Sequence, residues 1–186
     1  MKLAGSCHCR AVRFTVDASS PVPFMHCHCS ICRKTAGSGG FGINLGASMP
    51  TLKVRGAQHL GTYHAVMREP GERSKRSKAE RRFCLKCGSA LWLWDPRRPE
   101  LVHPHASAID TPLPKPPEIV EADLADAPAW VDVPAGADHR HERRWPTESL
   151  EDWHRRHGLL GGGPAATAGP RRRRVRHRLA SDAAQP

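Results

Sequence analysis

Short segments in which apolar and polar residues alternate recur through the first half of the chain. Residues 11–16 place Val12, Phe14 and Val16 on one face, as expected of a half-buried strand. Similar patterns predict further short strands over 41–45, 52–55, 60–63 and 89–94. Prolines between residues 96 and 117 interrupt any longer element. The pattern therefore predicts a mainly β fold built from short strands.

One helix is indicated near the C-terminal end of this patterned region, at about residues 148–157. Thr147 or Ser149 can serve as its N-cap, and Gly158 can end it. Residues spaced as on one helical face are Leu150, Trp153, His154 and His157. The acidic, proline-containing stretch before it, residues 118–144, is interpreted as a connector, and the helix as the only one in the fold.

Charge is concentrated in two segments. Of the formal net charge of +11, residues 68–82 carry +4 and residues 161–186 carry +5, so the rest of the chain is nearly neutral. A nucleic-acid-binding domain would spread Lys and Arg over a folded face. Nucleic acid is therefore a partner that we consider, through the arginine-rich tail, but do not favour.

No segment has the features of a membrane span or a secretory signal. The longest apolar run is five residues, 90–94, whereas a bilayer span needs about 20, and the first residues lack an apolar stretch. We expect a cytoplasmic protein with no membrane partner. In a reducing compartment, disulfide bonds do not account for an odd number of cysteines.

The seven cysteines fall into three clusters with metal-binding spacing. These clusters are Cys7-His8-Cys9, Cys27-His28-Cys29-Ser30-Ile31-Cys32 and Cys84-Leu85-Lys86-Cys87-Gly88. In extended backbone, residues i and i+2 point the same way, and Cys-x-x-Cys before a glycine forms a turn in which two sulfurs can bind one ion. A structural zinc site takes four ligands and a catalytic site takes three plus an open position. Seven thiols are the number needed for one structural site with four ligands and one catalytic site with three.

Spacing alone leaves two further interpretations of the cysteines open. They can be ordinary buried core residues. A redox-active Cys-x-x-Cys is a second alternative, but it does not account for the two Cys-x-Cys pairs. Spacing also does not decide which cysteines share an ion.

Three segments around these clusters, 5–14, 27–34 and 82–91, match a known family in order, spacing and flanking residues. They resemble the glutathione-dependent formaldehyde-activating enzyme family, which also includes centromere protein V. The resemblance extends from about residue 5 to residue 112 and is weaker around Trp130 and over 148–160. The tail matches nothing in the family.

The resemblance implies a compact β-tent of short antiparallel strands with two zinc ions per chain. On the family pattern, the structural zinc site comprises Cys7, Cys9, Cys84 and Cys87. The second, catalytic-type zinc site comprises Cys27, Cys29 and Cys32. We divide the chain into a zinc-binding domain at 1–134, an extension with the C-terminal helix at 135–160, and a disordered arginine-rich tail at 161–186.

The reaction implied by the resemblance is the addition of glutathione to formaldehyde, giving S-hydroxymethylglutathione, or its reversal, a carbon–sulfur lyase-type activity. Three thiolates give bound Zn²⁺ a formal charge of −1, so the ion is a weak Lewis acid that still accepts a soft ligand such as a substrate thiol. Because thiols add to formaldehyde unaided, two non-enzymatic interpretations stay open. One is a thiol carrier, and the other is a zinc module that binds nucleic acid or protein through its basic segments.

Three further groups are candidates with weaker signals. His26 and His28 alternate with the cysteines, so they should lie on the opposite face of their strand, as acid–base groups, ligands or packing residues. Glycines at 37–40 can offer backbone N–H groups to a peptide-like substrate or form a turn. The basic residues of 68–82 can bind the carboxylates of glutathione or form a solvated loop.

Overall fold

The predicted strand at residues 11–16 is β2 (Arg13–Asp17), in which Phe14 and Val16 are buried and the residues around them are not. It forms the middle of an antiparallel sheet, between β1 (Lys2–Ser6) and β6 (Lys53–Arg55). This alternation gives the sheet one apolar face, which covers the first of two cores.

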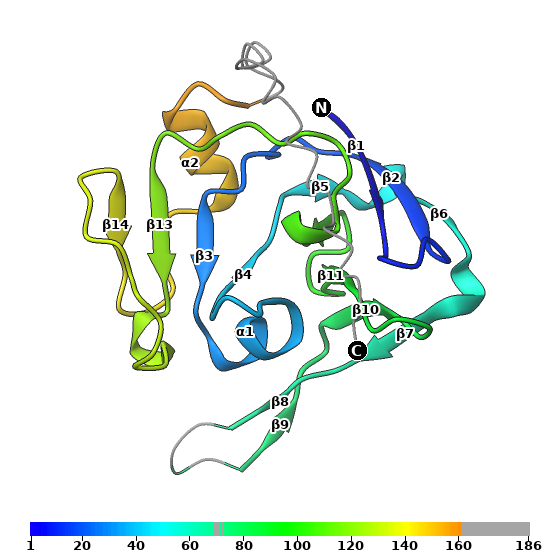
Figure 1. Ribbon diagram of the computed structural model, residues 1–186, viewed down its shortest axis with the longest axis horizontal. Coiled ribbons are helices and arrows are strands. Elements are labelled where there is room, and N and C mark those ends of the chain that lie inside the picture. The colour runs from blue at the N-terminus through cyan, green and yellow to red at the C-terminus, as the bar shows by residue number, and fades with distance from the viewer. Residues whose placement is uncertain (69–70, 72, 161–186) are drawn as a thin grey trace, which may run out of the picture.

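The computed structural model describes residues 1–68, 71 and 73–160. Over these residues the fold is mainly β, as predicted (Figure 1). The predicted disordered tail, 161–186, lies outside the described residues. No helix in the described part of the chain is long and apolar enough to cross a membrane.

A five-stranded antiparallel sheet packs against the first. Its order is β5 (Ala47–Ser48), β12 (Leu101–Pro104), β11 (Ala90–Trp94), β10 (Glu80–Cys84) and β7 (Leu60–Tyr63). The Phe14 ring meets Trp92 edge-on at 5.1 Å between centroids. A Cβ on Gly5 would lie 2.4 Å from the Phe14 ring, so a glycine at this position allows the strands to pack closely.

The third sheet corrects two predictions. Its order is β14 (His139–His141), β13 (Ile119–Ala122), β3 (Met25–Cys27) and β4 (Gly42–Ile43). The stretch 118–144 is therefore not a connector but supplies two strands. The strands are also not all antiparallel, because β13 runs parallel to both β3 and β14. The acidic composition was misleading because Glu121, in the middle of β13, is buried with three histidine partners.

The described part of the chain contains two helices, where one was predicted. The unpredicted α1 (Ser30–Ala36) follows β3 directly, and the predicted C-terminal helix is α2 (Leu150–Arg156). The Ser149 hydroxyl caps α2 by accepting a hydrogen bond from the Asp152 N–H, and Gly158 follows the helix with a φ of +68°. Short 3-10 turns occur at Met49–Thr51, Ala57–His59, Ala106–Ala108 and Leu124–Asp126.

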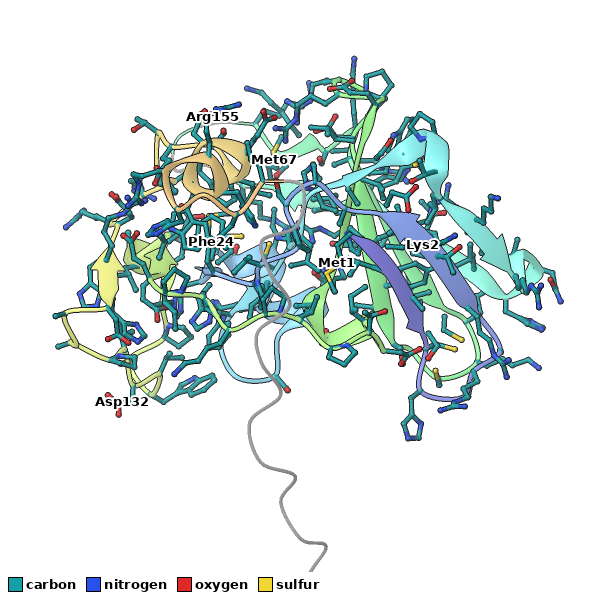
Figure 2. The ribbon with its side chains drawn as sticks, turned by 90° about the horizontal axis from the view of Figure 1, so that it is seen from above. Met1, Lys2, Phe24, Met67, Asp132 and Arg155 are labelled. Carbon is teal, nitrogen blue, oxygen red and sulfur yellow. The ribbon has the colours of Figure 1, made fainter. Side chains whose placement is uncertain are left out.

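Helix α2 closes the second core over the β3–β13 part of the third sheet. Trp153 is fully buried and stacks on Phe24 at 3.9 Å with the rings nearly parallel. Val120 and Ala122 of β13 belong to the same apolar cluster. Figure 2 shows Phe24 beneath α2, and Arg155 on the outer side of the helix. Residues on both sides of position 134 thus share one sheet and one core.

The basic segment 68–82 is not a single loop. β8 (Val66–Met67) and β9 (Lys75–Arg76) pair as an antiparallel hairpin that projects away from the sheets (Figure 1). The last residues of the segment belong to β10, inside the five-stranded sheet. Arg81 is therefore separated in the fold from the charges of the hairpin.

Candidate metal centres

Four cysteines from two distant parts of the chain meet at one end of the first core. Their ligand atoms, all within 4.8 Å of one another, belong to Cys7, Cys9, Cys84 and Cys87. Cys7 and Cys84 are buried, while Cys9 and Cys87 are exposed. We refer to this set as the four-cysteine cluster.

Tight turns bring these four sulfurs together. Arg10 ends the first turn with a φ of +59°, and Gly88 ends the second with a φ of +73°. The Val12 N–H donates to Cys7 Sγ at 3.2 Å, and the Gly88 N–H donates to the Cys84 carbonyl at 2.8 Å. Both turns therefore place a pair of thiols on one side of the backbone.

The sulfur spacing fits a tetrahedral metal site. With metal–sulfur bonds of about 2.3 Å, as zinc makes, sulfurs at the corners of a tetrahedron lie about 3.8 Å apart. The observed separations are 3.6 Å between Cys7 Sγ and Cys9 Sγ, and 3.8 Å between Cys9 Sγ and Cys84 Sγ. The four-cysteine cluster can therefore hold a metal ion with a complete set of protein ligands.

Three cysteines form a second set, the three-cysteine cluster, where β3 leads into α1. Cys27 ends β3, Cys29 is the N-cap of α1, and Cys32 lies in its first turn, with its N–H donating to Cys29 Sγ at 3.3 Å. The three ligand atoms lie within 4.8 Å of one another. Cys27 and Cys32 are buried and Cys29 is partly exposed.

This set is incomplete as a tetrahedral site. Within the part of the chain that the structure describes, no fourth ligand atom from a His, Cys, Asp or Glu residue lies within 4.8 Å of all three sulfurs. The unequal sets of four and three thiols are the main chemical difference between the two clusters.

A guanidinium group lies against the three-cysteine cluster. Arg81, in β10, donates from Nη2 to Cys32 Sγ at 3.6 Å and from Nη1 to Thr35 Oγ1 at 3.4 Å. Hydrogen bonds from the Cys27 and Cys29 thiols, together with the Arg81 charge, lower the pKa of Cys32 despite its burial. Arg81 is thus placed to offset negative charge on the cluster, a role that its position in a basic sequence segment concealed.

A carboxyl group lies on the other side of the cluster, next to Cys27. The Cys27 thiol donates to Asp123 Oδ2 at 3.6 Å. Burial and the Cys29 charge raise the pKa of Asp123. Asp123 also has a φ of +58°, a left-handed conformation that is uncommon outside glycine. No pattern in the sequence marks this residue.

His26 and His28, which were predicted to lie opposite the cysteines, both contact a buried carboxylate. Glu121 is 1% exposed, and its oxygens lie 3.1 Å from His26 Nδ1, 2.7 Å from His28 Nε2 and 3.0 Å from His139 Nδ1. Burial alone would raise the pKa of Glu121, but the hydrogen bonds from His26 and His28 lower it to about 2. Through Glu121 of β13, His26 and His28 connect this strand to the β3 side of the three-cysteine cluster, and His139 connects it to β14.

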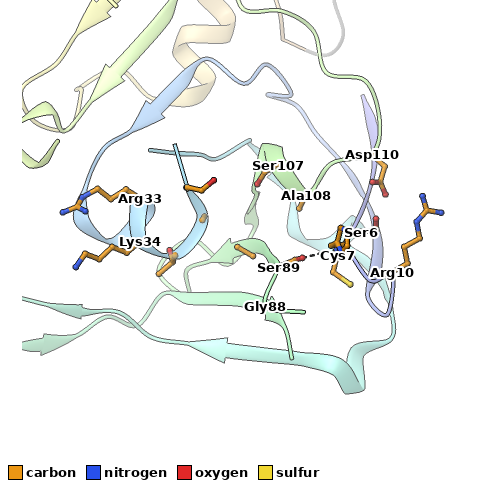
Figure 3. Close-up of a pocket in the computed structure, with 16 residues that line it drawn as sticks. Ser6, Cys7, Arg10, Arg33, Lys34, Gly88, Ser89, Ser107, Ala108 and Asp110 are labelled. Carbon is orange, nitrogen blue, oxygen red and sulfur yellow. Dashed lines mark hydrogen bonds between the residues drawn. The ribbon is translucent and has the colours of Figure 1, made fainter. Parts of the chain in front are cut away.

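A cleft of about 740 Å³ separates α1 from the turns of the four-cysteine cluster. Gly37 and Ser38 line it on the helix side and Gly88 and Ser89 on the other, so part of the glycine segment noted in the sequence borders the cleft. Figure 3 shows Arg33 and Lys34 pointing away from Ser89 and Cys7. Small polar groups thus border the space between the two walls, while the charged ends of these two side chains lie toward its edge.

Comparison with known proteins places these clusters in a family context. The model of the family described as glutathione-dependent formaldehyde-activating enzyme matches residues 2–122, which include all seven cysteines. A Halomonas elongata protein, provisionally named a glutathione-dependent formaldehyde-activating enzyme, is 51% identical over 162 residues, covering 87% of this chain and 100% of that protein. A crystal structure of a Rhodobacter sphaeroides protein is similar at 28% identity, with a TM-score of 0.45, and the match covers 61% of this chain and 92% of that one.

Proposed function

The chain belongs to the glutathione-dependent formaldehyde-activating enzyme family, and we propose that it joins a small thiol to an aldehyde, or cleaves the carbon–sulfur bond of the adduct, at the three-cysteine cluster. Glutathione and formaldehyde are the substrates that the family points to. The observation that carries the proposal is the three-thiol ligand set, which leaves room for a fourth ligand where the four-cysteine cluster does not.

Zinc suits both sets of soft sulfur donors, and we propose one ion in each cluster. When bound at the three-cysteine cluster, zinc would supply an open coordination position at which a thiol loses its proton more easily. The four-cysteine cluster, with a complete ligand set, would have a structural role.

Two residues beside the three-cysteine cluster would then compensate its charge and transfer protons. Arg81 would offset the net negative charge of three thiolates around a divalent ion. Asp123 Oδ2 would accept the proton of the incoming thiol; the sulfur then forms a bond with the carbonyl carbon, and Asp123 returns the proton to the resulting alkoxide oxygen. The cleft beside α1 would take the peptide part of glutathione through its serine and backbone groups.

We expect glutathione to bind the zinc-loaded protein as a thiolate. Removing a proton from a thiol with a pKa near 8.5 costs about 2 kcal/mol at pH 7. Affinity should therefore rise as pH increases toward the pKa of the free thiol. S-methylglutathione, which has no ionisable thiol, should bind at least about ten-fold more weakly, a loss of about 1.4 kcal/mol. Calorimetric titrations at several pH values would measure both effects and the proton released.

The Cys32→Ser variant is the control for this experiment. It should bind both ligands equally weakly while the four-cysteine cluster keeps its metal. If the wild-type protein binds S-methylglutathione as tightly as glutathione, the thiol does not reach the cluster. A parallel assay of adduct formation separates catalysis from a carrier role, since a carrier binds glutathione without accelerating the reaction.

A second prediction concerns Arg81. Replacing it with methionine removes a charged hydrogen bond to Cys32, a type of interaction that contributes about 1.5–3 kcal/mol. The three-cysteine cluster should then lose zinc at a chelator concentration at least about ten-fold lower than in the wild-type protein.

The neighbouring Arg82 provides the matched control. It lies next to Arg81 in β10 but pairs with Glu80 at 2.5 Å. Arg82→Met should leave the chelator midpoint unchanged. Equal shifts in the two variants would mean that loss of positive charge alone, rather than the contact with Cys32, controls metal retention.

A further inference from the structure

A separate cavity of about 420 Å³ lies between the β11–β12 part of the five-stranded sheet and the segment that leads into α2. It shares no lining residue with the cleft beside α1, and none of the seven cysteines lines it. We propose that this cavity binds a small neutral alcohol or phenol with an apolar body. The cavity is distinct from the three-cysteine cluster, although Asn44 in its wall also contacts Cys32.

Apolar side chains form much of the wall. Met25, Leu93, Leu101 and Leu150 line the cavity, and Trp145, which is 55% exposed, lines it as well. Cavities of about 300–1,000 Å³ with mainly apolar walls and a few polar groups are typical small-molecule sites. An aromatic ring or a branched aliphatic group would bury its surface against these side chains.

The polar group that selects the ligand is His103, which is 8% exposed and lines the cavity. Its Nδ1 lies 3.0 Å from the Leu45 carbonyl oxygen. A carbonyl only accepts, so Nδ1 must carry the proton and donate. Because burial lowers the pKa of His103, the ring is neutral and Nε2 is an acceptor. Nε2 has no hydrogen-bond partner in the described residues and is not sealed off from solvent.

Asn44 is a second polar residue in the wall of the cavity. Its Nδ2 donates to Cys32 Sγ at 3.9 Å. Its Oδ1 is buried without a hydrogen-bond partner in the described part of the chain. Because this oxygen has no exposed surface, a ligand in the cavity does not reach it, and His103 Nε2 is the group that calls for a ligand that donates a hydrogen bond.

The charged residues that line the cavity limit which hydrogen-bond donor the ligand can carry. Glu148 and Glu151 line the cavity but already pair with arginines, whereas Arg98 forms no ion pair within the residues that the structure describes. The positive charge of Arg98 disfavours an ammonium group. A carboxylate lacks the proton that His103 Nε2 needs. A neutral hydroxyl group meets both conditions.

Benzyl alcohol is a suitable probe, tested on the metal-loaded protein through the fluorescence of Trp145. We expect a saturable change in fluorescence that is lost in Trp145→Phe, a variant in which ligand-observed NMR should still detect binding. Benzyl methyl ether, which has no donor, and benzylamine, which is a cation near neutral pH, should each bind at least about five-fold more weakly than benzyl alcohol.

The His103→Phe variant removes the acceptor and retains an aromatic ring. In this variant, benzyl alcohol and its methyl ether should bind equally. The proposal is overturned if the fluorescence change does not saturate, or if the wild-type protein fails to distinguish the alcohol from the ether. The comparison of ligands on the wild-type protein decides the question even if the variant does not fold.

Discussion

Replacing Cys84 with serine should prevent the protein from folding, whereas replacing Cys29 should leave a folded protein with one zinc ion fewer. Cys84 is fully buried, and its cluster joins the turn after β1 to the turn after β10. Cys9 and Cys84 are 75 residues apart, so a shared ion closes a long loop, and binding free energy at such a site is folding free energy. The ligands of the three-cysteine cluster all lie within one short segment, so its ion holds little of the chain together.

Zinc content and circular dichroism of the two variants would test this difference. We expect about one zinc ion per chain and a native spectrum for Cys29→Ser. For Cys84→Ser we expect aggregation or an unfolded spectrum. Equal loss of structure in both variants would rule out the division into a structural and a catalytic-type site.

Removing the carboxylate of Glu121 should lower the free energy of unfolding by about 3–5 kcal/mol, the usual cost of breaking a buried charged network by deleting one partner. The Glu121→Ala change leaves His26, His28 and His139 without their common acceptor. Urea unfolding of the metal-loaded protein would measure the loss.

Two variants make this result specific. Glu121→Gln keeps an acceptor oxygen, so its free energy of unfolding should lie between those of the wild-type protein and Glu121→Ala. Glu151→Ala removes an exposed glutamate that pairs only with Arg155 on the surface of α2, among the residues described, and it should change the free energy of unfolding by less than about 1 kcal/mol. A similar small effect at Glu121 would show that the histidines find other partners.

Sequence alone predicted several strands from their own apolar residues. The pattern placed β4, β6, β7 and β11 within the predicted segments, and β2 extends one residue beyond its segment. The other strands of the third sheet, β3, β13 and β14, escaped prediction because β13 pairs in parallel with strands from other parts of the chain. β13 is recognisable as a strand only when β3 is beside it, since a buried Glu121 in its centre breaks the expected alternation. Helix α1 was missed because the Cys-x-x-Cys motif, interpreted as a metal-binding turn, forms its first residues.

The two cysteine clusters were predictable as candidate metal sites because all of the donors are in the motif itself. The residues around the cysteines that affect their chemistry were not predictable, because each comes from another part of the chain. In the sequence Arg81 is one of several charges in a basic segment, and Asp123 and Asn44 reach the three-cysteine cluster only through tertiary contacts. Local pattern identifies what can bind a metal, whereas the groups that tune the metal site depend on the complete fold.

The wide separation of the ligands in the four-cysteine cluster also sets an order of events during protein synthesis. At about 5–20 residues per second, the ribosome adds the 75 residues between Cys9 and Cys84 in roughly 4–15 s. Within that interval Cys27, Cys29 and Cys32 are added as a complete set, whereas Cys7 and Cys9 still lack Cys84 and Cys87. If both clusters bind metal as proposed, the three-cysteine cluster can therefore capture an ion before the four-cysteine cluster is complete.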